Sequence, residues 1–175
     1  SGLTRPKWAL RLFGERNLLQ QAWQRARAVA EAGDCFVVTG LGQAALVRRS
    51  LPELPAANLL IEPEPRDTAG AIALAAGAIS AVSSPDASVK SPKSKVQSPK
   101  PGVMLVLPGD HIIHPVERFR ECVLAGARTA AETGALVTLG IVPRHAGTGY
   151  GYLPRGEELA PARAPEGPPR VYRVL

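Results

Sequence analysis

The sequence predicts an α/β fold with a mostly parallel, doubly wound sheet, and three observations carry this prediction. Apolar runs of strand length, such as Val103–Leu107, alternate with segments whose apolar residues recur at helical spacing. Glycines and prolines separate these segments. Strands that alternate with helices are typical of βαβ units, which build parallel sheets. With 175 residues the chain has the length of one domain.

The first half of the chain contains local signals for three helices and two strands. Asn17 and Gln20 form a capping-box pair ahead of apolar residues at helical spacing, and Gly33 ends that helix. Asp67 and Thr68 favour the start of the third helix. Predicted are an extended start over 1–8, helices over 17–32, 43–50 and from 67 onward, and strands over 35–39 and 58–61.

The second half begins with Ser83–Gly102, a segment rich in Ser, Pro and Lys that we interpret as a disordered surface excursion. Val103–Leu107 follows as a buried central strand. Pro115 begins a helix with apolar residues at helical spacing, and Gly134 ends it. Further along, the pattern predicts a strand over 135–141, a polar turn region over 157–169 and a last strand from 170.

The positive charge is local and does not predict a nucleic-acid partner. Four lysines lie within Ser83–Gly102, and without that segment the net charge falls from +6 to +3. Aromatic residues make up 5% of the chain and do not alternate with basic ones, as single-strand binding requires. A moderately basic fold suits phosphorylated small molecules instead.

The sequence also argues against a membrane protein and a disulfide framework. No apolar stretch approaches the ~18 residues of a membrane span, and we find no signal peptide. Cys35 and Cys122 lie in segments expected to be internal, so both are expected to be reduced. We therefore expect a cytoplasmic protein. Because the chain has no initiator Met, we also expect that its natural start lies upstream of Ser1.

Polar side chains follow the predicted central strand at once, in Pro108–His111. Ligands of open α/β sheets bind at the carboxyl ends of the strands. A carboxylate at that place beside a phosphate site is the usual protein ligand of Mg²⁺, so Asp110 is a candidate metal ligand. The alternative is an ordinary strand exit with a solvated Asp.

Two further strand ends carry polar groups, in Glu62–Thr68 and in Pro143–Tyr152. In a doubly wound sheet these segments and Pro108–His111 would meet at one edge and form one ligand cleft. Gly149 and Gly151 would let backbone N–H groups approach a ligand, with tyrosines as walls. The alternative is a glycine-relieved bend in an edge strand with aromatic packing.

Three isolated side chains carry weaker signals. Lys7 would neutralise a phosphate or is simply solvated, because it lies near the start of the chain. His111 and His145 are possible acid–base groups, but no nucleophile pairs with either, and a hydrogen-bonded loop His is the alternative. The sequence contains no Cys/His metal spacing and no nucleophile elbow.

The order of these segments resembles the mannose-1-phosphate guanylyltransferase family of sugar-phosphate nucleotidyltransferases. Pro6-Lys7 with the following leucines resembles the family's PKQFL, and Glu62-Pro63 followed by Arg66–Ala69 resembles EP…RNTAPA. Pro108–His111 resembles PADH, and the region from Gly140 to Tyr152 resembles GI.P..TGYGY. The four blocks span nearly the whole chain outside the Lys-rich segment.

The resemblance implies a Rossmann-like, GT-A-like core that uses Mg²⁺ to transfer a guanylyl group from GTP to mannose 1-phosphate. It implies no nucleic-acid or membrane partner and leaves a homo-oligomer open. The implied residues are Lys7 and Asp110 for phosphate, metal and catalysis; Glu62, Arg66, Asp67, Thr68, Pro108 and Gly109 for the nucleotide; and Gly149, Tyr150 and Gly151 for the sugar phosphate.

The chain also departs from the family pattern. The opening glycine-rich loop and the later blocks are absent, so these 175 residues are expected to form part of a nucleotidyltransferase domain that is inactive by itself. Asp67 replaces Asn, Gly70 replaces Pro and Gly109 replaces Ala near the base site. Two alternatives therefore stay open: a related hexose-1-phosphate nucleotidyltransferase with another nucleotide, or a non-catalytic nucleotide-sugar-binding subunit.

Overall fold

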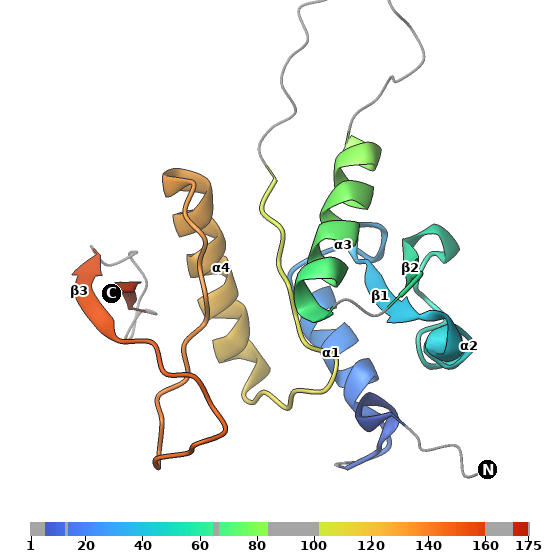
Figure 1. Cartoon of the computed structure of the whole chain (residues 1–175), viewed down its shortest axis with the longest axis horizontal. Coiled ribbons are helices and arrows are strands. Elements are labelled where there is room, and N and C mark those ends of the chain that lie inside the picture. The colour runs from blue at the N-terminus through green and yellow to red at the C-terminus, as the bar shows by residue number, and fades with distance from the viewer. Residues whose placement is uncertain (1–5, 13, 65–66, 84–101, 160–169, 175) are drawn as a thin grey trace, which may run out of the picture. The chain divides into compact units, whose positions relative to one another are not determined.

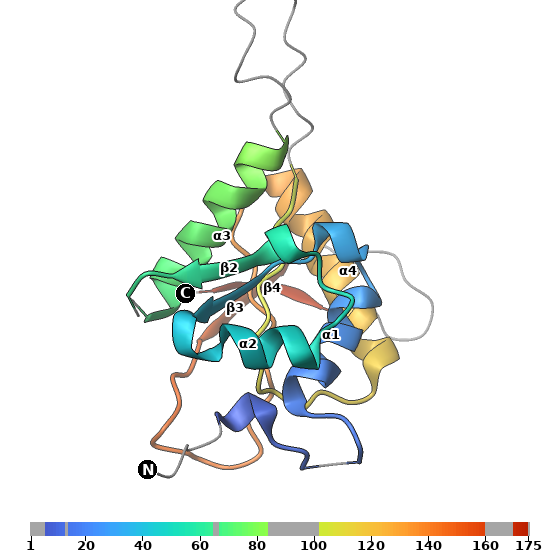
Figure 2. The same ribbon diagram turned by 90° about the vertical axis from the view of Figure 1, so that its right-hand side faces the viewer.

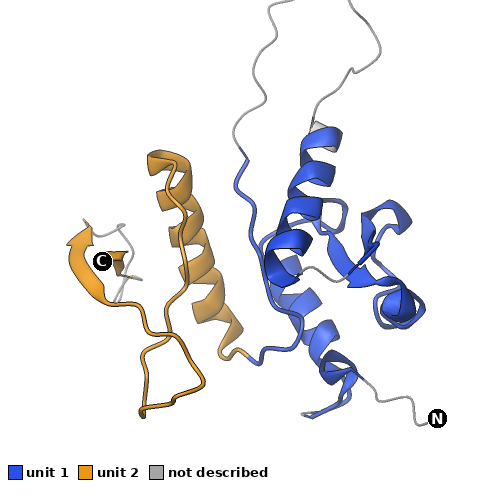
Figure 3. Cartoon of the chain, viewed as in Figure 1, with its two compact units in different colours: residues 1–112 blue, residues 113–175 orange. Residues whose placement is uncertain are grey.

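Two parallel strands lie at the centre of the N-terminal part of the chain in this computed structural model, which describes residues 6–12, 14–64, 67–83, 102–159 and 170–174. Strand β1 (Val37–Gly40) pairs with β2 (Leu59–Glu62), from Val37 opposite Leu59 to Gly40 opposite Glu62. The chain divides into two compact units, residues 1–112 and 113–175 (Figure 3). The parallel pairing confirms the βαβ prediction for this region.

Helices pack on both faces of the strand pair (Figure 1, Figure 2). Helix α2 (Leu41–Ser50) follows β1 without a loop, and α3 (Asp67–Ser83) lies on the opposite side of the strands. A buried apolar cluster joins α1, α2 and β2 through Leu19, Val47 and Leu59. The mixed α/β class and the helix-covered parallel strands agree with the sequence prediction.

Helix α1 (Leu18–Arg27) begins with the predicted capping box. The Asn17 side chain accepts a hydrogen bond from the Gln20 backbone N–H at 2.8 Å, and Gln20 Oε1 accepts one from the Asn17 N–H at 3.0 Å. Asn17 also donates to Ser50 Oγ at 3.1 Å, which ties the start of α1 to the end of α2. The helix ends five residues earlier than predicted, because the chain tightens through a bond from Val29 N–H to the Ala26 carbonyl.

The described residues contain three short turns of 3₁₀ helix: Lys7–Ala9 precedes α1, Ala32–Asp34 precedes β1 and Ala56–Asn58 precedes β2. The prediction of an extended start over 1–8 is therefore wrong for Lys7 and Trp8, which lie in the first of these turns, where the Ala9 N–H bonds the Pro6 carbonyl at 2.9 Å. Pro6 is extended, as predicted, and residues 1–5 of that start lie outside the described ones. Most of the predicted surface excursion, 84–101, also lies outside them.

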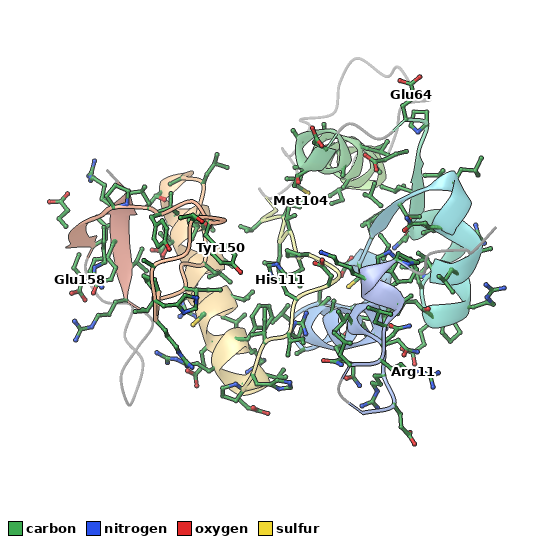
Figure 4. The ribbon with its side chains drawn as sticks, turned by 60° about the horizontal axis from the view of Figure 1, so that its bottom comes forward. Arg11, Glu64, Met104, His111, Tyr150 and Glu158 are labelled. Carbon is green, nitrogen blue, oxygen red and sulfur yellow. The ribbon has the colours of Figure 1, made fainter. Side chains whose placement is uncertain are left out.

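Two predicted strands are not strands in the structure. Val103–Leu107 and Ala135–Ile141 form no ladder with any described residue, and their side chains are mostly exposed. An apolar run predicts a strand only by its composition, whereas a strand needs a neighbour that supplies backbone donors and acceptors. Figure 4 shows Met104 and His111 on the irregular segment of the N-terminal unit.

The C-terminal unit contains α4 (Val116–Thr133) and an antiparallel pair, β3 (Arg155–Leu159) and β4 (Val171–Val174). Pro115 precedes α4 and Gly134 ends it at a φ of 69°, as predicted. The turn prediction for 157–169 is wrong at its start, because residues 157–159 belong to β3, in which Glu158 and Leu159 pair with β4. Residues 160–169 lie outside the described ones. Across the pair of β3 and β4 the Arg173 Nε donates to Glu157 Oε1 at 3.0 Å.

Among the described residues, we find no helix that combines the length and the apolar character needed to cross a bilayer.

Candidate functional site

The carboxyl ends of β1 and β2 form one edge with two helix N-termini. Gly40 and Glu62 are the last residue pair of the ladder, α2 begins at the next residue, and α3 begins at Asp67. Free N–H groups at a helix N-terminus favour phosphate oxygens. The structure therefore brings the half-buried Glu62 and the exposed start of α3, Asp67 with Thr68, to an edge where helix N–H groups favour a phosphate. The carboxylates of Glu62 and Asp67 would instead accept hydrogen bonds from donor groups of a ligand.

The backbone of Asp67 is unusual at this edge. Its φ of 54° lies in the left-handed region, which Asp tolerates better than most side chains. Arg66, the other predicted nucleotide contact beside it, lies outside the described residues.

Lys7 lies in a turn that is attached to the same edge. The indole Nε1 of its neighbour Trp8 donates to Gln43 Oε1, in the first turn of α2, at 2.9 Å. The Lys7 side chain itself is exposed. The contact of Lys7 with a phosphate stays a prediction.

The Pro108–His111 loop carries the predicted metal ligand, and α1 contacts it on both sides of that residue. Asp110 is exposed within a turn. On the N-terminal side of Asp110, a Cβ added at Gly109 would lie 3.4 Å from Leu19 Cδ1. On its C-terminal side, the His111 carbonyl accepts a hydrogen bond from Arg25 Nη2 at 2.8 Å. The loop thus follows an irregular segment rather than the predicted strand, and α1 positions it.

Among the described residues, the surroundings of Asp110 suit a magnesium site that is completed by the substrate. The described residues contain no group of three or more His, Cys, Asp and Glu that could enclose a metal ion. Mg²⁺ in nucleotide-binding enzymes is commonly held by one or two carboxylates together with substrate phosphates and water. A single exposed carboxylate suits that arrangement and does not suit an all-protein cage.

The glycine-rich loop of the C-terminal unit forms an open pocket of about 500 Å³. The Tyr152 hydroxyl accepts from the Gly147 N–H at 2.7 Å and donates to the Gly147 carbonyl at 3.0 Å, which closes the loop. Tyr150 lines the pocket. A Cβ at Gly149 or Gly151 would meet no atom within 4 Å, so the backbone there is open to approach. The pocket is lined by Pro143, Arg144, His145, Ala146, Gly147, Thr148, Tyr150 and Tyr152.

Sequence reasoning missed two residues that shape these loops. Arg25 lies on the buried face of α1 with Leu18 and Ala22, so a charged residue at apolar spacing was the available signal. A Cβ added at Gly147 would lie 3.1 Å from Tyr150 Cδ2, so the Tyr150 ring leaves little room for a side chain there. No local sequence pattern distinguishes Gly147 from the other glycines of this loop. The meeting of Pro108–His111 with the Tyr150 loop at one cleft stays a prediction, because the two units are described separately.

The parallel strands, the helix N-termini at their carboxyl edge and the glycine-rich loop are typical of an α/β protein that handles a phosphorylated ligand. The chain belongs to the nucleotidyl transferase family, whose model matches residues 2–168. This family implies a Rossmann-like fold, in agreement with β1 and β2 between their helices.

Three relatives are similar over most of this chain. It is 36% identical over 153 residues to a mannose-1-phosphate guanylyltransferase of Escherichia coli, covering 86% of this chain and 29% of the relative. A protein of the same name from Sinorhizobium fredii is 35% identical over 161 residues, which cover 91% of this chain and 28% of the relative. The xanthan biosynthesis protein XanB of Xanthomonas campestris is 36% identical over 156 residues, which cover 87% of this chain and 29% of the relative. The chain thus spans less than a third of the length of these relatives.

Proposed function

We propose that this protein transfers a guanylyl group from GTP to α-D-mannose 1-phosphate and releases pyrophosphate. The observation that carries the proposal is the similarity to proteins named mannose-1-phosphate guanylyltransferase over 86% and 91% of this chain. An edge suited to a phosphorylated ligand supports it from the structure.

The reaction is a displacement at the α-phosphorus of GTP. A phosphate oxygen of mannose 1-phosphate forms the new bond to that phosphorus, and the bond from the α-phosphorus to the bridging oxygen of the β-phosphate breaks. Pyrophosphate leaves with the electron pair of that bond. The reacting groups are all anionic, so the protein's task is to align them and to offset their charge.

We assign charge compensation to Lys7 and to Asp110 with a divalent cation. Lys7 is exposed, and its neighbour Trp8 bonds the first turn of α2, so we assign Lys7 to phosphate contact there. Asp110 would hold Mg²⁺ together with phosphate oxygens of the nucleotide. The ion would supply positive charge between those oxygens.

Substrate binding is divided between the two units in this proposal. The nucleotide would bind along Glu62, Arg66, Asp67 and Thr68, with Pro108 and Gly109 beside it. The hexose phosphate would accept backbone hydrogen bonds at Gly149 and Gly151 next to Tyr150. The open surroundings of these two glycines support that role.

The test uses the protein expressed at the full length of its coding sequence, with Mg²⁺ and mannose 1-phosphate. GTP, ATP, CTP and UTP are compared by pyrophosphate release and by formation of the nucleotide sugar. We expect GTP to be preferred by at least about a hundredfold in kcat/KM, because a site that hydrogen-bonds guanine rejects bases lacking its groups.

The other outcomes identify the alternatives. Preference for another nucleotide or another hexose 1-phosphate would make the protein a related transferase. Binding of GDP-mannose, detected by calorimetry, without pyrophosphate release from any pair would indicate a binding subunit. Either result would contradict the proposal.

A further inference from the structure

We propose that Arg25 is a positioning residue that holds the loop of Asp110 against α1. This inference rests on the proposed function where it assigns the metal to Asp110, whereas the attachment of the loop itself is a property of the structure. Neither the sequence motifs nor the family assignment gives Arg25 a role.

The loop is attached to α1 on both sides of Asp110. Arg25 Nη2 donates to the His111 carbonyl at 2.8 Å, across 86 residues of sequence. Leu19, six residues earlier in the same helix, lies 3.4 Å from the Cβ position of Gly109. Asp110 is exposed between these two contacts, so the helix fixes its neighbours and leaves its carboxylate open to a ligand.

The helix is itself fixed, which makes it a suitable support. Its capping box joins Asn17 to Gln20, and both of these residues also bond Ser50, at the end of α2. Leu19 belongs to the buried cluster with Val47. Through the contact from Arg25, the loop that carries Asp110 is therefore attached to the core of the N-terminal unit.

Stability alone does not account for an arginine at this position. Arg25 is 3% exposed, and burial lowers the pKa of its guanidinium. Its Nε is buried and bonds no partner among the described residues. A buried cation with an unpaired donor opposes folding, and an apolar side chain of similar length would avoid that cost. The bond to the His111 carbonyl is what an apolar side chain could not replace.

The first experiment compares Arg25→Met with Arg27→Met in the protein expressed at full length. Arg27 is the matched control, because it lies in the same helix but its guanidinium bonds the nearby Glu31 at 3.2 Å. Native-state thermolysin cleavage before Ile112 is followed by mass spectrometry. We expect Arg25→Met to accelerate this cleavage about tenfold or more, with cleavage elsewhere in the N-terminal unit unchanged, and Arg27→Met to have no effect.

The second experiment measures Mn²⁺ binding in the presence of GTP by electron paramagnetic resonance, together with the Mg²⁺ dependence of pyrophosphate release. We expect Arg25→Met to weaken metal binding by about 10- to 100-fold, the usual effect of losing a group that orients a ligand. Arg25→Lys keeps a donor of nearly the same reach, so we expect partial recovery in both measurements.

The outcomes separate the inference from the proposed function. If Asp110→Ala leaves metal binding intact, the metal assignment fails, while the cleavage result still tests the attachment of the loop. Unchanged cleavage before Ile112 in Arg25→Met would overturn the inference. General cleavage throughout α1 in both Arg25→Met and Arg25→Lys would also overturn it, because Arg25 would then support the fold rather than the loop.

Discussion

The side-chain amide of Asn58 holds the segment that leads into β1. Its Nδ2 donates to the Gly33 carbonyl at 2.8 Å and to the Cys35 carbonyl at 2.9 Å, and the residue is 8% exposed. One side chain thus satisfies two backbone acceptors and places the start of β1 beside β2. Its effect on stability follows from the cost of leaving those acceptors unpaired.

Replacing this amide is expected to destabilise the protein. Asn58→Ala should lower the free energy of unfolding by about 1–3 kcal/mol, because two carbonyls lose their donor. Asn58→Asp should cost more, since a carboxylate would face two carbonyl oxygens. Urea unfolding measures both, with the exposed Ala57→Ser as control. An unchanged midpoint for Asn58→Ala would contradict the role described.

The thiol of Cys35 gives a pH-dependent prediction. Burial raises the pKa of this thiol above its ordinary value of 9.0. The nearby charge of Arg27 lowers the pKa, but this effect is smaller than that of burial. The folded state therefore holds the proton more strongly, and this contribution to stability is present below pH 9.0 and is lost as the pH rises through the folded pKa.

At pH 8, iodoacetamide should modify Cys122 before Cys35, because Cys122 is only half-buried whereas Cys35 is buried. Peptide mapping measures the order, and labelling in urea is the control in which both react. Above about pH 9, unfolding of Cys35→Ala should depend less on pH than unfolding of the unaltered protein. Faster labelling of Cys35 in the native state would contradict this description.

At the scale of elements, helix ends and strand pairing differ in how far the sequence predicts them. The start of α1 at Asn17 and the end of α4 at Gly134 were predictable, because capping side chains and left-handed glycines act locally. The irregular conformation of Val103–Leu107 was not predictable, because strand pairing depends on a neighbour far along the chain. The same limit applies to the site: the motif marks Asp110, but the contact from Arg25 exists only in the fold.

Two glycines in helices should respond to alanine in opposite ways. Gly134 ends α4 at a φ of 69°, and Gly77 lies within α3; a Cβ at either would meet no atom within 4 Å. Gly134→Ala should therefore lower stability by about 1–2 kcal/mol through backbone strain alone. Gly77→Ala should raise it by about 0.5–1 kcal/mol through helix propensity. Thermal unfolding measures both, and equal signs would contradict the assigned helix boundaries.

At the scale of the whole molecule, the proposal joins loops from two units that the structure describes separately. The family assignment covers both units, since its model matches residues 2–168. Four short blocks of sequence predicted the family, which is confirmed. The site residues that these blocks mark stay predictions, and the meeting of Asp110 with Tyr150 depends on how distant segments pack. No local pattern contains that information, so it is tested through function.

The most direct test is pyrophosphate release by the protein expressed at full length with GTP, mannose 1-phosphate and Mg²⁺, comparing the unaltered protein with Asp110→Ala. Asp34→Ala is the control, because Asp34 is an exposed acid in a turn away from the proposed ligands. We expect Asp110→Ala to lose about a thousandfold or more in kcat/KM, the effect of several kcal/mol of lost charge stabilisation, and Asp34→Ala to keep full activity. Full activity in Asp110→Ala would contradict the account.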